Sequence, residues 1–198
     1  MENLSKLTRK GMVYREGRAV SHEKLIEKSV YYFTKFIRKN NISKKLGHKP
    51  ILLELGSDNG FALKKFRDKG FNVIGIDLEP HNVFNVPIIQ GDWNDLNLYF
   101  EDDKFDCVFW NHGINQCLNP VLILQKINNV MKKGGYIFLA LLHGYFKYAQ
   151  DVSKGNFSLF TPLFLNSMMN FCGFERVKSE LRCFRGNRVE IFYIGRKI

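Results

Sequence analysis

The chain has 198 residues, of which 45% are hydrophobic and 14% aromatic, and its formal net charge is +11. Its length suggests one domain, and so many apolar side chains exclude a disordered tail or a fibrous repeat. The longest apolar run, residues 136–142, is strand-sized and much shorter than the roughly 18 residues of a membrane-spanning helix. Residues 1–10 lack the apolar segment of a signal peptide. We therefore expect a cytoplasmic protein without a membrane partner.

The cysteines indicate the redox environment. None belongs to a CxxC pair, and all lie in apolar surroundings: Cys107, Cys117, Cys172 and Cys183. We interpret them as reduced core thiols of a cytosolic protein, and we expect no metal site.

The positive charge is concentrated near the N-terminus. Residues 1–50 hold 13 Lys and Arg against 4 Asp and Glu, whereas residues 51–150 hold 9 against 11. Such a segment could steer a polyanion or an acidic substrate towards one face. A drift of the coding sequence towards Lys, Asn, Ile and Phe would produce the same charge. Nucleic acid is therefore the second choice of partner, after a small molecule.

The elements can be predicted in chain order. After an irregular segment, an amphipathic helix is predicted over residues 21–39 with Ser21 as its N-cap, followed by a polar connector over 40–49. From Pro50 strands and helices alternate. The predicted strands are 51–55, 72–78, 86–90, 105–110 and 136–142; the predicted helices are 61–69, 120–131 and 161–172, ended by Gly70, Gly134–Gly135 and Gly173. Strands 174–184 and 189–195 flank a Gly186–Asn187 turn, which is typical of a hairpin.

This order predicts an α/β fold: an open, doubly wound, mostly parallel seven-stranded sheet with helices on both faces and a C-terminal antiparallel hairpin. Residues 50–198 would form this domain, and residues 1–49 a basic segment and helix that serves as a lid or cap. Sheets of this kind bind ligands at the carboxyl ends of their strands. The loops after residues 55, 78, 90, 110 and 142 are therefore the place to look for a site.

The first of these loops follows the strand that ends in Glu54-Leu55, and its sequence is Gly56-Ser57-Asp58-Asn59-Gly60. The two glycines allow a tight turn before a helix, but the dinucleotide pattern GxGxxG is absent. A carboxylate here would repel a pyrophosphate and suits a cationic group such as an ammonium. A plain strand-to-helix turn is the alternative interpretation.

Two further acids follow the next strands. Asp77, about twenty residues downstream, could accept both hydroxyls of a ribose or could cap a helix. Asp92 could bind an exocyclic amine while Trp93 contacts a base, or Trp93 could be a core residue after a turn.

Taken together, this order of elements resembles the class I S-adenosylmethionine-dependent methyltransferases, in particular the small-molecule type of the ubiquinone-biosynthesis-like group. In that group the fourth strand begins with Phe-Asp, here Phe105-Asp106, and the fifth follows a Lys-x-Gly-Gly turn, here residues 132–135. Gly173-Phe174 matches a late Gly-Phe element of the family. The resemblance covers about residues 50–198 and implies a Rossmann-like methyltransferase fold.

The resemblance also implies S-adenosylmethionine as cofactor and assigns residues to it. The loop would lie under the methionine portion with Glu54 towards its ammonium, the second strand end would bind ribose and adenine, and the third the adenine amino group. The residues concerned are Glu54, Gly56, Ser57, Asp58, Gly60, Asp77, Leu78, Asp92, Trp93 and Asn111, the last of which would line the meeting point of cofactor and acceptor.

The chain departs from the family pattern in several places. Asp58 stands where a glycine is usual, and Gln116 where the closest relatives often carry His. Asp92 follows Asp77 by only 15 positions, and two prolines lie between them, so the helix between the second and third strands should be short or lost.

Methyl transfer from a sulfonium needs alignment above all, and a base only where the acceptor must lose a proton. The candidates for a catalytic role are His112, His143 and Tyr145, although each could be a hydrogen-bonded structural residue. The acceptor would contact residues of two aromatic or basic segments: Tyr14, Arg15 and Arg18, and Tyr145 and Phe146.

We thus expect a methyltransferase acting on a small molecule by in-line displacement. An RNA methyltransferase that uses the basic N-terminal segment is the alternative, followed by a nicotinamide-dependent oxidoreductase and an inactive scaffold. The sequence leaves the acceptor and the oligomeric state open.

Overall fold

The computed structural model describes residues 16–144, 150, 152, 155–184 and 188–198, with side chains from residue 23 onwards. Its sheet has seven strands in the order β3-β2-β1-β4-β5-β7-β6. The strands are β1 (Ile51–Leu55), β2 (Asn72–Asp77), β3 (Ile88–Gln90), β4 (Phe105–Asn111), β5 (Met131–Leu142), β6 (Phe174–Phe184) and β7 (Arg188–Lys197). The first five run parallel to one another, and β7 pairs antiparallel with β5 and β6. The predicted fold class is confirmed.

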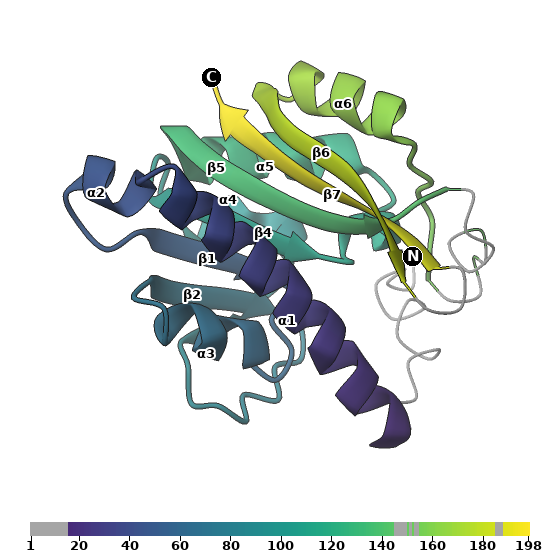
Figure 1. Ribbon diagram of the computed structural model, residues 1–198, viewed down its shortest axis with the longest axis horizontal. Coiled ribbons are helices and arrows are strands. Elements are labelled where there is room, and N and C mark those ends of the chain that lie inside the picture. The colour runs from purple at the N-terminus through teal and green to yellow at the C-terminus, as the bar shows by residue number, and fades with distance from the viewer. Residues whose placement is uncertain (1–15, 145–149, 151, 153–154, 185–187) are drawn as a thin grey trace.

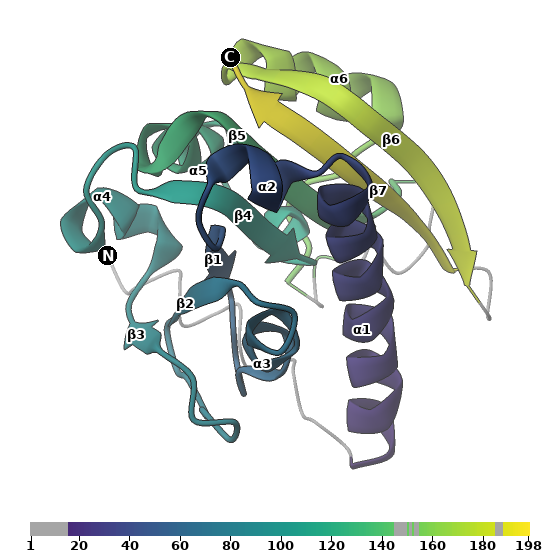
Figure 2. The ribbon, with the colours of Figure 1, turned by 60° about the vertical axis from the view of Figure 1, so that its left-hand side comes forward.

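Helices cover both faces of the sheet (Figures 1 and 2). One face carries α1 (Glu16–Lys39), α2 (Ile42–Leu46) and α3 (Phe61–Arg67). The other carries α4 (Leu96–Tyr99), α5 (Pro120–Val130) and α6 (Pro162–Phe171). Successive strand residues alternate between the two cores: Val108 and Trp110 belong to the second, Cys107 and Phe109 to the first. The period-two geometry of a buried strand produces this division.

Aromatic packing holds α1 on the sheet. The rings of Phe109 and Phe138, on neighbouring strands, are stacked with centroids 5.2 Å apart. Phe33 of α1 stacks on Phe138 at 5.5 Å. Because these three side chains are fully buried, α1 is an integral layer of the fold.

Several element boundaries differ from the prediction. The first helix begins at Glu16, so Ser21 is not its N-cap, and the expected connector contains α2. The short α4 was not predicted, because its four residues are too few for a periodic pattern. No helix is found between β2 and β3, as the prolines indicated.

The Gly134–Gly135 pair does not separate α5 from the following strand. The helix ends at Val130, and β5 starts at once and contains both glycines, with Gly134 at φ +79°. Phe105 pairs with Met131 and Cys107 with Tyr136, so a shift of register between these pairs accommodates residues 132–135.

The Phe-Asp element has a structural explanation. The buried Asp106 accepts a hydrogen bond from the backbone amide of Ile51 at 2.9 Å, and its other oxygen lies 2.9 Å from Nζ of Lys132. One carboxylate therefore joins the beginnings of three adjacent strands, β1, β4 and β5.

The prediction for the cysteines was wrong at one position. Cys107, Cys117 and Cys172 are buried free thiols, but Cys183 is exposed. It lies on β6, the edge strand, whose residues mostly face solvent. Among the described residues, no helix is long and apolar enough to cross a membrane, and no group of three or more His, Cys, Asp or Glu could hold a metal ion.

Candidate functional site

The loop between β1 and α3 makes a tight left-handed turn. Gly56, Asp58 and Gly60 have φ values of +72°, +42° and +82°. Asp58 thus adopts the conformation that favours glycine, which Asp tolerates better than most residues. A Cβ at Gly56 would lie 3.1 Å from the Trp93 ring, so glycine there lets the loop after β3 approach closely.

The end of β2 fixes this loop. One oxygen of Asp77 accepts a hydrogen bond from the Asp58 amide at 2.9 Å, and the other accepts one from the Glu79 amide at 2.9 Å. Asp77 is therefore not a helix cap, as one interpretation of the sequence had it. Leu78 is half-buried, and its carbonyl accepts a hydrogen bond from the Gln90 side chain at 3.1 Å.

A pocket opens beside the loop and contains five of the ten predicted cofactor residues: Glu54, Gly56, Ser57, Asp58 and Asn111. Glu23 and Ile26 of α1 also line it. Residues from β1, β4, the loop and the first helix therefore meet at the carboxyl edge of the sheet.

Three side-chain atoms of this pocket are buried without a hydrogen-bond partner among the described residues: Oε2 of Glu54, Oγ of Ser57 and Oδ1 of Asn111. Leaving one such atom unsatisfied costs about 1–3 kcal/mol. Three of them around one pocket indicate a binding site for a polar ligand with hydrogen-bond donors.

The charge of the pocket is unusual. Burial first of all, and then the negative charges of Asp77 and Asp58, raise the pKa of Glu54 well above its ordinary value. The hydrogen bond from a backbone amide only partly offsets this. A cationic group in the pocket would favour the ionised form of Glu54, because an opposite charge nearby stabilises a carboxylate.

The loop after β3 contributes a short turn. Asp92 accepts hydrogen bonds from the amide and the side chain of Asn94, both at 2.8 Å, at the start of a 3-10 turn, η2 (Trp93–Asp95). Trp93 is half-buried and meets the Trp110 ring edge to face, with centroids 5.7 Å apart. Trp93 thus packs on the core, and Asp92 acts as a cap.

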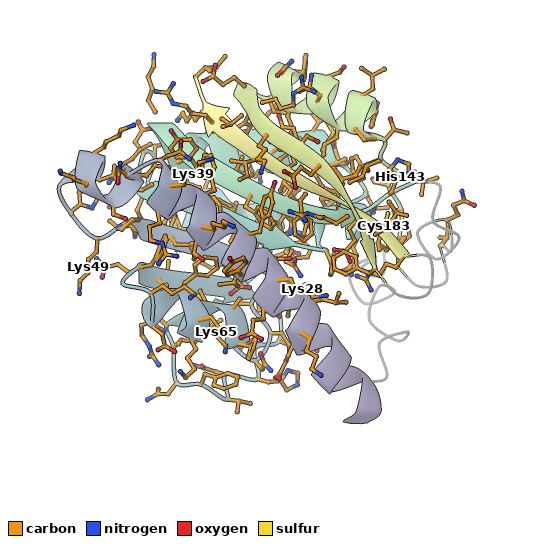
Figure 3. The ribbon with its side chains drawn as sticks, in the orientation of Figure 1. Lys28, Lys39, Lys49, Lys65, His143 and Cys183 are labelled. Atoms are coloured by element: carbon orange, nitrogen blue, oxygen red, sulfur yellow. The ribbon has the colours of Figure 1, made fainter. Side chains whose placement is uncertain are left out.

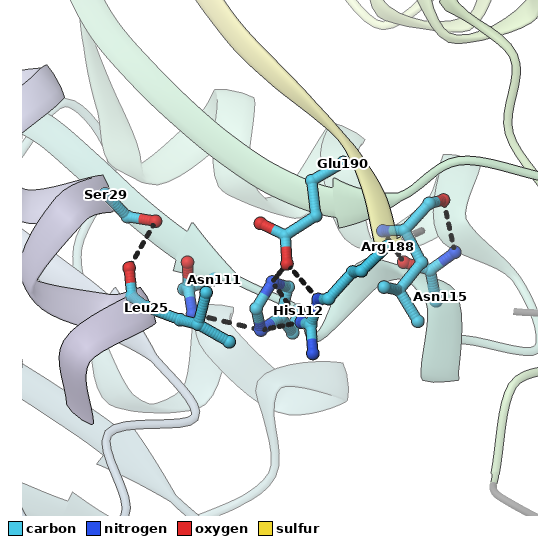
Figure 4. A network of polar contacts seen from close by, with 8 residues as sticks. Leu25, Ser29, Asn111, His112, Asn115, Arg188 and Glu190 are labelled. Carbon is cyan, nitrogen blue, oxygen red and sulfur yellow. Dashed lines mark hydrogen bonds and ion pairs between the residues drawn. The ribbon is translucent and has the colours of Figure 1, made fainter. Parts of the chain in front are cut away.

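A charged network lies next to Asn111 (Figure 4). His112 follows β4 with φ +61°, and its Nε2 lies 3.0 Å from Oε1 of Glu190 on β7. Nε of Arg188 lies 2.5 Å from the same oxygen. The Asn111 side chain approaches Nδ1 of His112 at 3.3 Å. Of the predicted catalytic residues, His112 is the one whose ring contacts a residue of the pocket.

The other residues predicted for catalysis or acceptor binding are not found in the pocket lining. His143 is buried at the end of β5, where its amide donates to Val189 at 3.0 Å, and it is not among the residues that line the pocket. Tyr14, Arg15, Tyr145 and Phe146 lie outside the described residues, and so does the side chain of Arg18.

Sequence reasoning missed Asn115, which is buried in the turn after β4. Its side chain accepts a hydrogen bond from the Leu142 amide at 2.9 Å and donates to the Ser158 carbonyl at 3.0 Å. Its own carbonyl accepts from the amides of Phe157 and Ser158. It therefore joins the loop after β4 to the segments on either side of residues 145–154. Sequence reasoning also missed Glu190. The signal that could have found it is a single charge inside the apolar run of residues 189–194.

Basic residues gather along the outer side of α1. A shallow depression between this helix, β6 and α3 is lined by Lys24, Lys28, Lys35, Lys39, Lys65, Lys69, Lys178 and Arg182. Figure 3 shows Lys28 and Lys39 along α1, and Lys65 on α3. Glu27 pairs with Lys65 at 2.9 Å, and Glu180 with Lys178 and Arg182.

Two sequence comparisons give matches in the middle of the chain. Residues 53–139 match a family described as "Methyltransferase domain". Over 89 residues, or 40% of the chain, the sequence is 32% identical to the demethylmenaquinone methyltransferase of Staphylococcus carnosus. The match spans 36% of the length of that relative.

Solved structures match more of the chain. The 1,6-didemethyltoxoflavin-N1-methyltransferase of Burkholderia thailandensis, with bound 1,6-didemethyltoxoflavin and S-adenosylhomocysteine, has a TM-score of 0.77 at 16% identity, over 98% of this chain and 88% of that one. An S-adenosylmethionine-dependent methyltransferase of Archaeoglobus fulgidus has a TM-score of 0.65 at 15% identity, over 84% and 100%. At such identities the likeness shows the fold alone.

Proposed function

We propose that this chain, whose residues 53–139 match the family described as "Methyltransferase domain", is a class I S-adenosylmethionine-dependent methyltransferase that transfers the methyl group of S-adenosylmethionine to a small-molecule acceptor. The single observation that carries this proposal is the set of three buried oxygens around one pocket that have no partner among the described residues, beside a left-handed glycine loop. The pocket fits the cofactor, because a ligand with an ammonium group and hydroxyls supplies the charge and the donors that these oxygens lack.

Different residues would bind different parts of the cofactor. Glu54 would hold the ammonium, with the loop from Gly56 to Gly60 beneath the methionine portion. Asp77, whose carboxylate accepts hydrogen bonds from two amides, would also bind the ribose hydroxyls. Asp92, with Leu78 and Trp93, would lie at the adenine. When bound, the cofactor supplies an electrophilic methyl carbon, and the chain aligns the acceptor with it.

The small-molecule acceptor is supported by the relatives. Their names specify a demethylmenaquinone and a didemethyltoxoflavin. Demethylmenaquinone and 1,6-didemethyltoxoflavin are therefore the first acceptors to test with this chain.

Calorimetry tests the cofactor site. We expect S-adenosylmethionine and S-adenosylhomocysteine to bind with micromolar affinity, about −8 kcal/mol. Glu54→Ala should weaken binding, whereas Glu101→Ala, an exposed residue outside the site, should not. If neither ligand gives heat or thermal stabilisation at millimolar concentration, the proposal is wrong. Stabilisation by a nicotinamide dinucleotide instead would favour an oxidoreductase.

Residues 1–49 would act as a lid over this site. Glu23 and Ile26 of α1 line the pocket, which supports a covering role for the first half of the helix. Bound S-adenosylhomocysteine should then slow hydrogen exchange at residues 23–30. Unchanged exchange there, with ligand bound, would contradict the lid.

An RNA methyltransferase remains the second candidate, and the basic depression along α1 favours it. On α1, Lys24 and Lys28, and Lys35 and Lys39, are spaced i, i+4, which costs helix stability unless a polyanion compensates. Binding of a single-stranded RNA that weakens steeply with salt, and that Lys28→Glu with Lys35→Glu abolishes, would support this candidate.

A further inference from the structure

A second pocket lies near the C-terminal end of α1. Its volume is about 400 Å³, within the usual range for pockets that hold small molecules. Three parts of the chain line it: the second half of α1 with Asn41, the short helix α2, and the turn between α3 and β2. Figure 1 shows α2 beside this end of α1. The pocket is therefore built by segments that the proposed methyl transfer does not use.

The second pocket and the cofactor pocket lie at opposite edges of the sheet. Phe71 lines the second pocket and directly precedes β2, whereas the cofactor pocket lies at the carboxyl ends of the strands. The helix α1 contributes to both pockets. Ile26 lines the cofactor pocket and Thr34 the second one, and about 12 Å of helix separates these two residues. A ligand in the second pocket would therefore leave the cofactor pocket free.

The two pockets have opposite charge. Among the residues that the structure describes, the lining of the cofactor pocket contains three acids and no Lys or Arg. The lining of the second pocket contains no acid and four cations, which are Lys35, Arg38, Lys44 and Lys69. Like charges repel and opposite charges attract. An anion with more than one negative charge would thus be repelled from the cofactor pocket and attracted to the second pocket.

These four cations form no ion pair with the described part of the chain. Two acids of the neighbouring segments have other partners, because Glu27 pairs with Lys65 at 2.9 Å and Asp68 with Lys64 at 2.5 Å. Nζ of Lys35 lies 5.6 Å from the centre of the Tyr31 ring, a contact that leaves the positive charge in place. The charges are therefore available to a ligand.

Polar donors and an apolar wall complete the second pocket. Asn41 has φ +53°, a left-handed conformation that Asn tolerates and that turns the chain from α1 into α2. Its side-chain amide and the hydroxyl of Ser43 also line the pocket and can donate hydrogen bonds. Ile37 and Phe71 are buried, and the ring of Tyr31 is 56% exposed at the rim. This composition suits an anionic group attached to an apolar or aromatic skeleton.

We propose that the second pocket binds a small organic phosphate, namely a phosphate monoester with an apolar or aromatic skeleton. At neutral pH a monoester carries a charge of about −1.5 to −2 and three acceptor oxygens. It therefore matches several cations better than a carboxylate with a single charge. The guanidinium of Arg38 can hold two of the oxygens, while the lysines supply point charges. The inference is independent of methyl transfer and adds a second ligand to this chain.

The phosphodiesters of a nucleic acid present a related group, so the test must separate them from a monoester. Each phosphodiester carries one charge, and a polymer is held through several phosphates along a surface. Lys35 and Lys69 line both the second pocket and the basic depression, but Lys28 lines the depression alone. Lys28→Gln should therefore leave the affinity for a monoester unchanged, whereas it should weaken any binding of single-stranded RNA.

The probe is 1-naphthyl phosphate, and its controls are 1-naphthol and inorganic phosphate, because each control lacks one half of the probe. Amide NMR of the labelled full chain, at constant ionic strength, reports where each compound binds. We expect the probe to shift the signals of residues 41–44 and 69–71 at millimolar concentration or below. It should bind about tenfold more tightly than either control, since charge and apolar contact both contribute. Equally tight binding of a control would overturn the substrate class.

Matched pairs of variants locate the site. Lys44→Gln should weaken probe binding about tenfold, whereas Lys45→Gln, on the same helix but outside the pocket lining, should not. Arg38→Gln and Lys39→Gln should show the same contrast, because only Arg38 lines this pocket. All four side chains are exposed, so the variants should fold. Equal losses within a pair would indicate diffuse attraction to a positive surface and would overturn the proposal.

Competition separates this site from the cofactor site. S-adenosylhomocysteine should shift the signals of residues 56–60 and should not displace the probe. Displacement would place the probe in the cofactor pocket and would contradict a second site, as would an absence of any shift at residues 41–44. Binding of single-stranded RNA that Lys28→Gln and Lys44→Gln both weaken, without binding of the monoester, would make this surface a nucleic-acid site instead. A chain that binds the probe but not S-adenosylhomocysteine would refute the proposed function and support this inference.

Discussion

The carboxylate of Asp77 and the backbone amide of Asp58 are 2.9 Å apart, and this hydrogen bond joins the end of β2 to the loop after β1. The same carboxylate bonds to the amide of Glu79. Asp77 therefore shapes the loop, and the binding role proposed for this carboxylate would be coupled to its structural role.

Substitution of Asp77 should affect both roles. Asp77→Ala removes the acceptor of two amides, so we expect a loss of stability of about 1–3 kcal/mol. It should also weaken S-adenosylhomocysteine binding by about 1.5–3 kcal/mol, as expected for hydrogen bonds to a charged group. Thermal unfolding and calorimetry on the same samples measure the two effects. Lower stability with unchanged affinity would leave Asp77 with a structural role only.

Binding of the cofactor should be coupled to the release of a proton from Glu54. Its folded-state pKa is raised, so the carboxyl contributes stability at low pH that is lost as pH rises from the ordinary glutamate value to the raised one. Within that window the free chain holds a proton which an ammonium ligand should displace. Binding enthalpies measured in buffers of different ionisation enthalpy should therefore reveal proton release.

The variant Glu54→Gln separates these effects. Because it cannot ionise, it should raise the melting temperature of the free chain at neutral pH, weaken cofactor binding and abolish proton release. An unchanged enthalpy across buffers with the wild-type chain would contradict the account of Glu54.

Two glycines form a matched pair for testing the loop. Gly60 and Gly70 have φ values of +82° and +89°, so alanine is strained at both, by about 1–2 kcal/mol. A Cβ at Gly60 would also lie 2.5 Å from Val86, whereas nothing lies within 4 Å at Gly70. Gly60→Ala should destabilise by about 1–3 kcal/mol more than Gly70→Ala, from overpacking. Equal losses in urea unfolding would show that Val86 moves aside freely.

Asp106 should matter for stability far from the pocket. Asp106→Ala leaves the Ile51 amide and the Lys132 ammonium without their acceptor, so we expect a loss of about 3 kcal/mol or more. The exposed Asp102 is the control, and Asp102→Ala should cost about 0.5 kcal/mol or less. Affinity for S-adenosylhomocysteine, measured well below the melting temperature, should stay the same in both. A large loss of affinity in Asp106→Ala would show that the strand beginnings influence the pocket.

The strands could be predicted because their signals are local. The predicted bounds of β1 and β6 agree with the structure, since apolar runs and glycine turns mark them directly. Glu54, Ser57 and Asn111 could be assigned to one edge of the sheet because parallel strands bring their carboxyl ends together. Their meeting in one pocket follows from topology.

Glu190 and Arg188 could not be placed in the same way. They approach His112 because β7 inserts between β5 and β6, which places Glu190 opposite Leu142 across the sheet. Nothing in the local sequence fixes that insertion or its register. The start of α1 failed for a different reason: residues 16–20 lack an apolar stripe, and helix propagation from the well-packed part extends through them.

The hydrogen bond from the amide of Gly144 to the carbonyl of Phe160, at 2.7 Å, has an evolutionary consequence. Together with Asn115, it brings the two ends of the chain between residues 144 and 160 to fixed, adjacent positions. Doubling the length of such a closed segment costs only about 0.6 kcal/mol of closure entropy. The sequence between these two ends can therefore change in length at little cost to the stability of the fold.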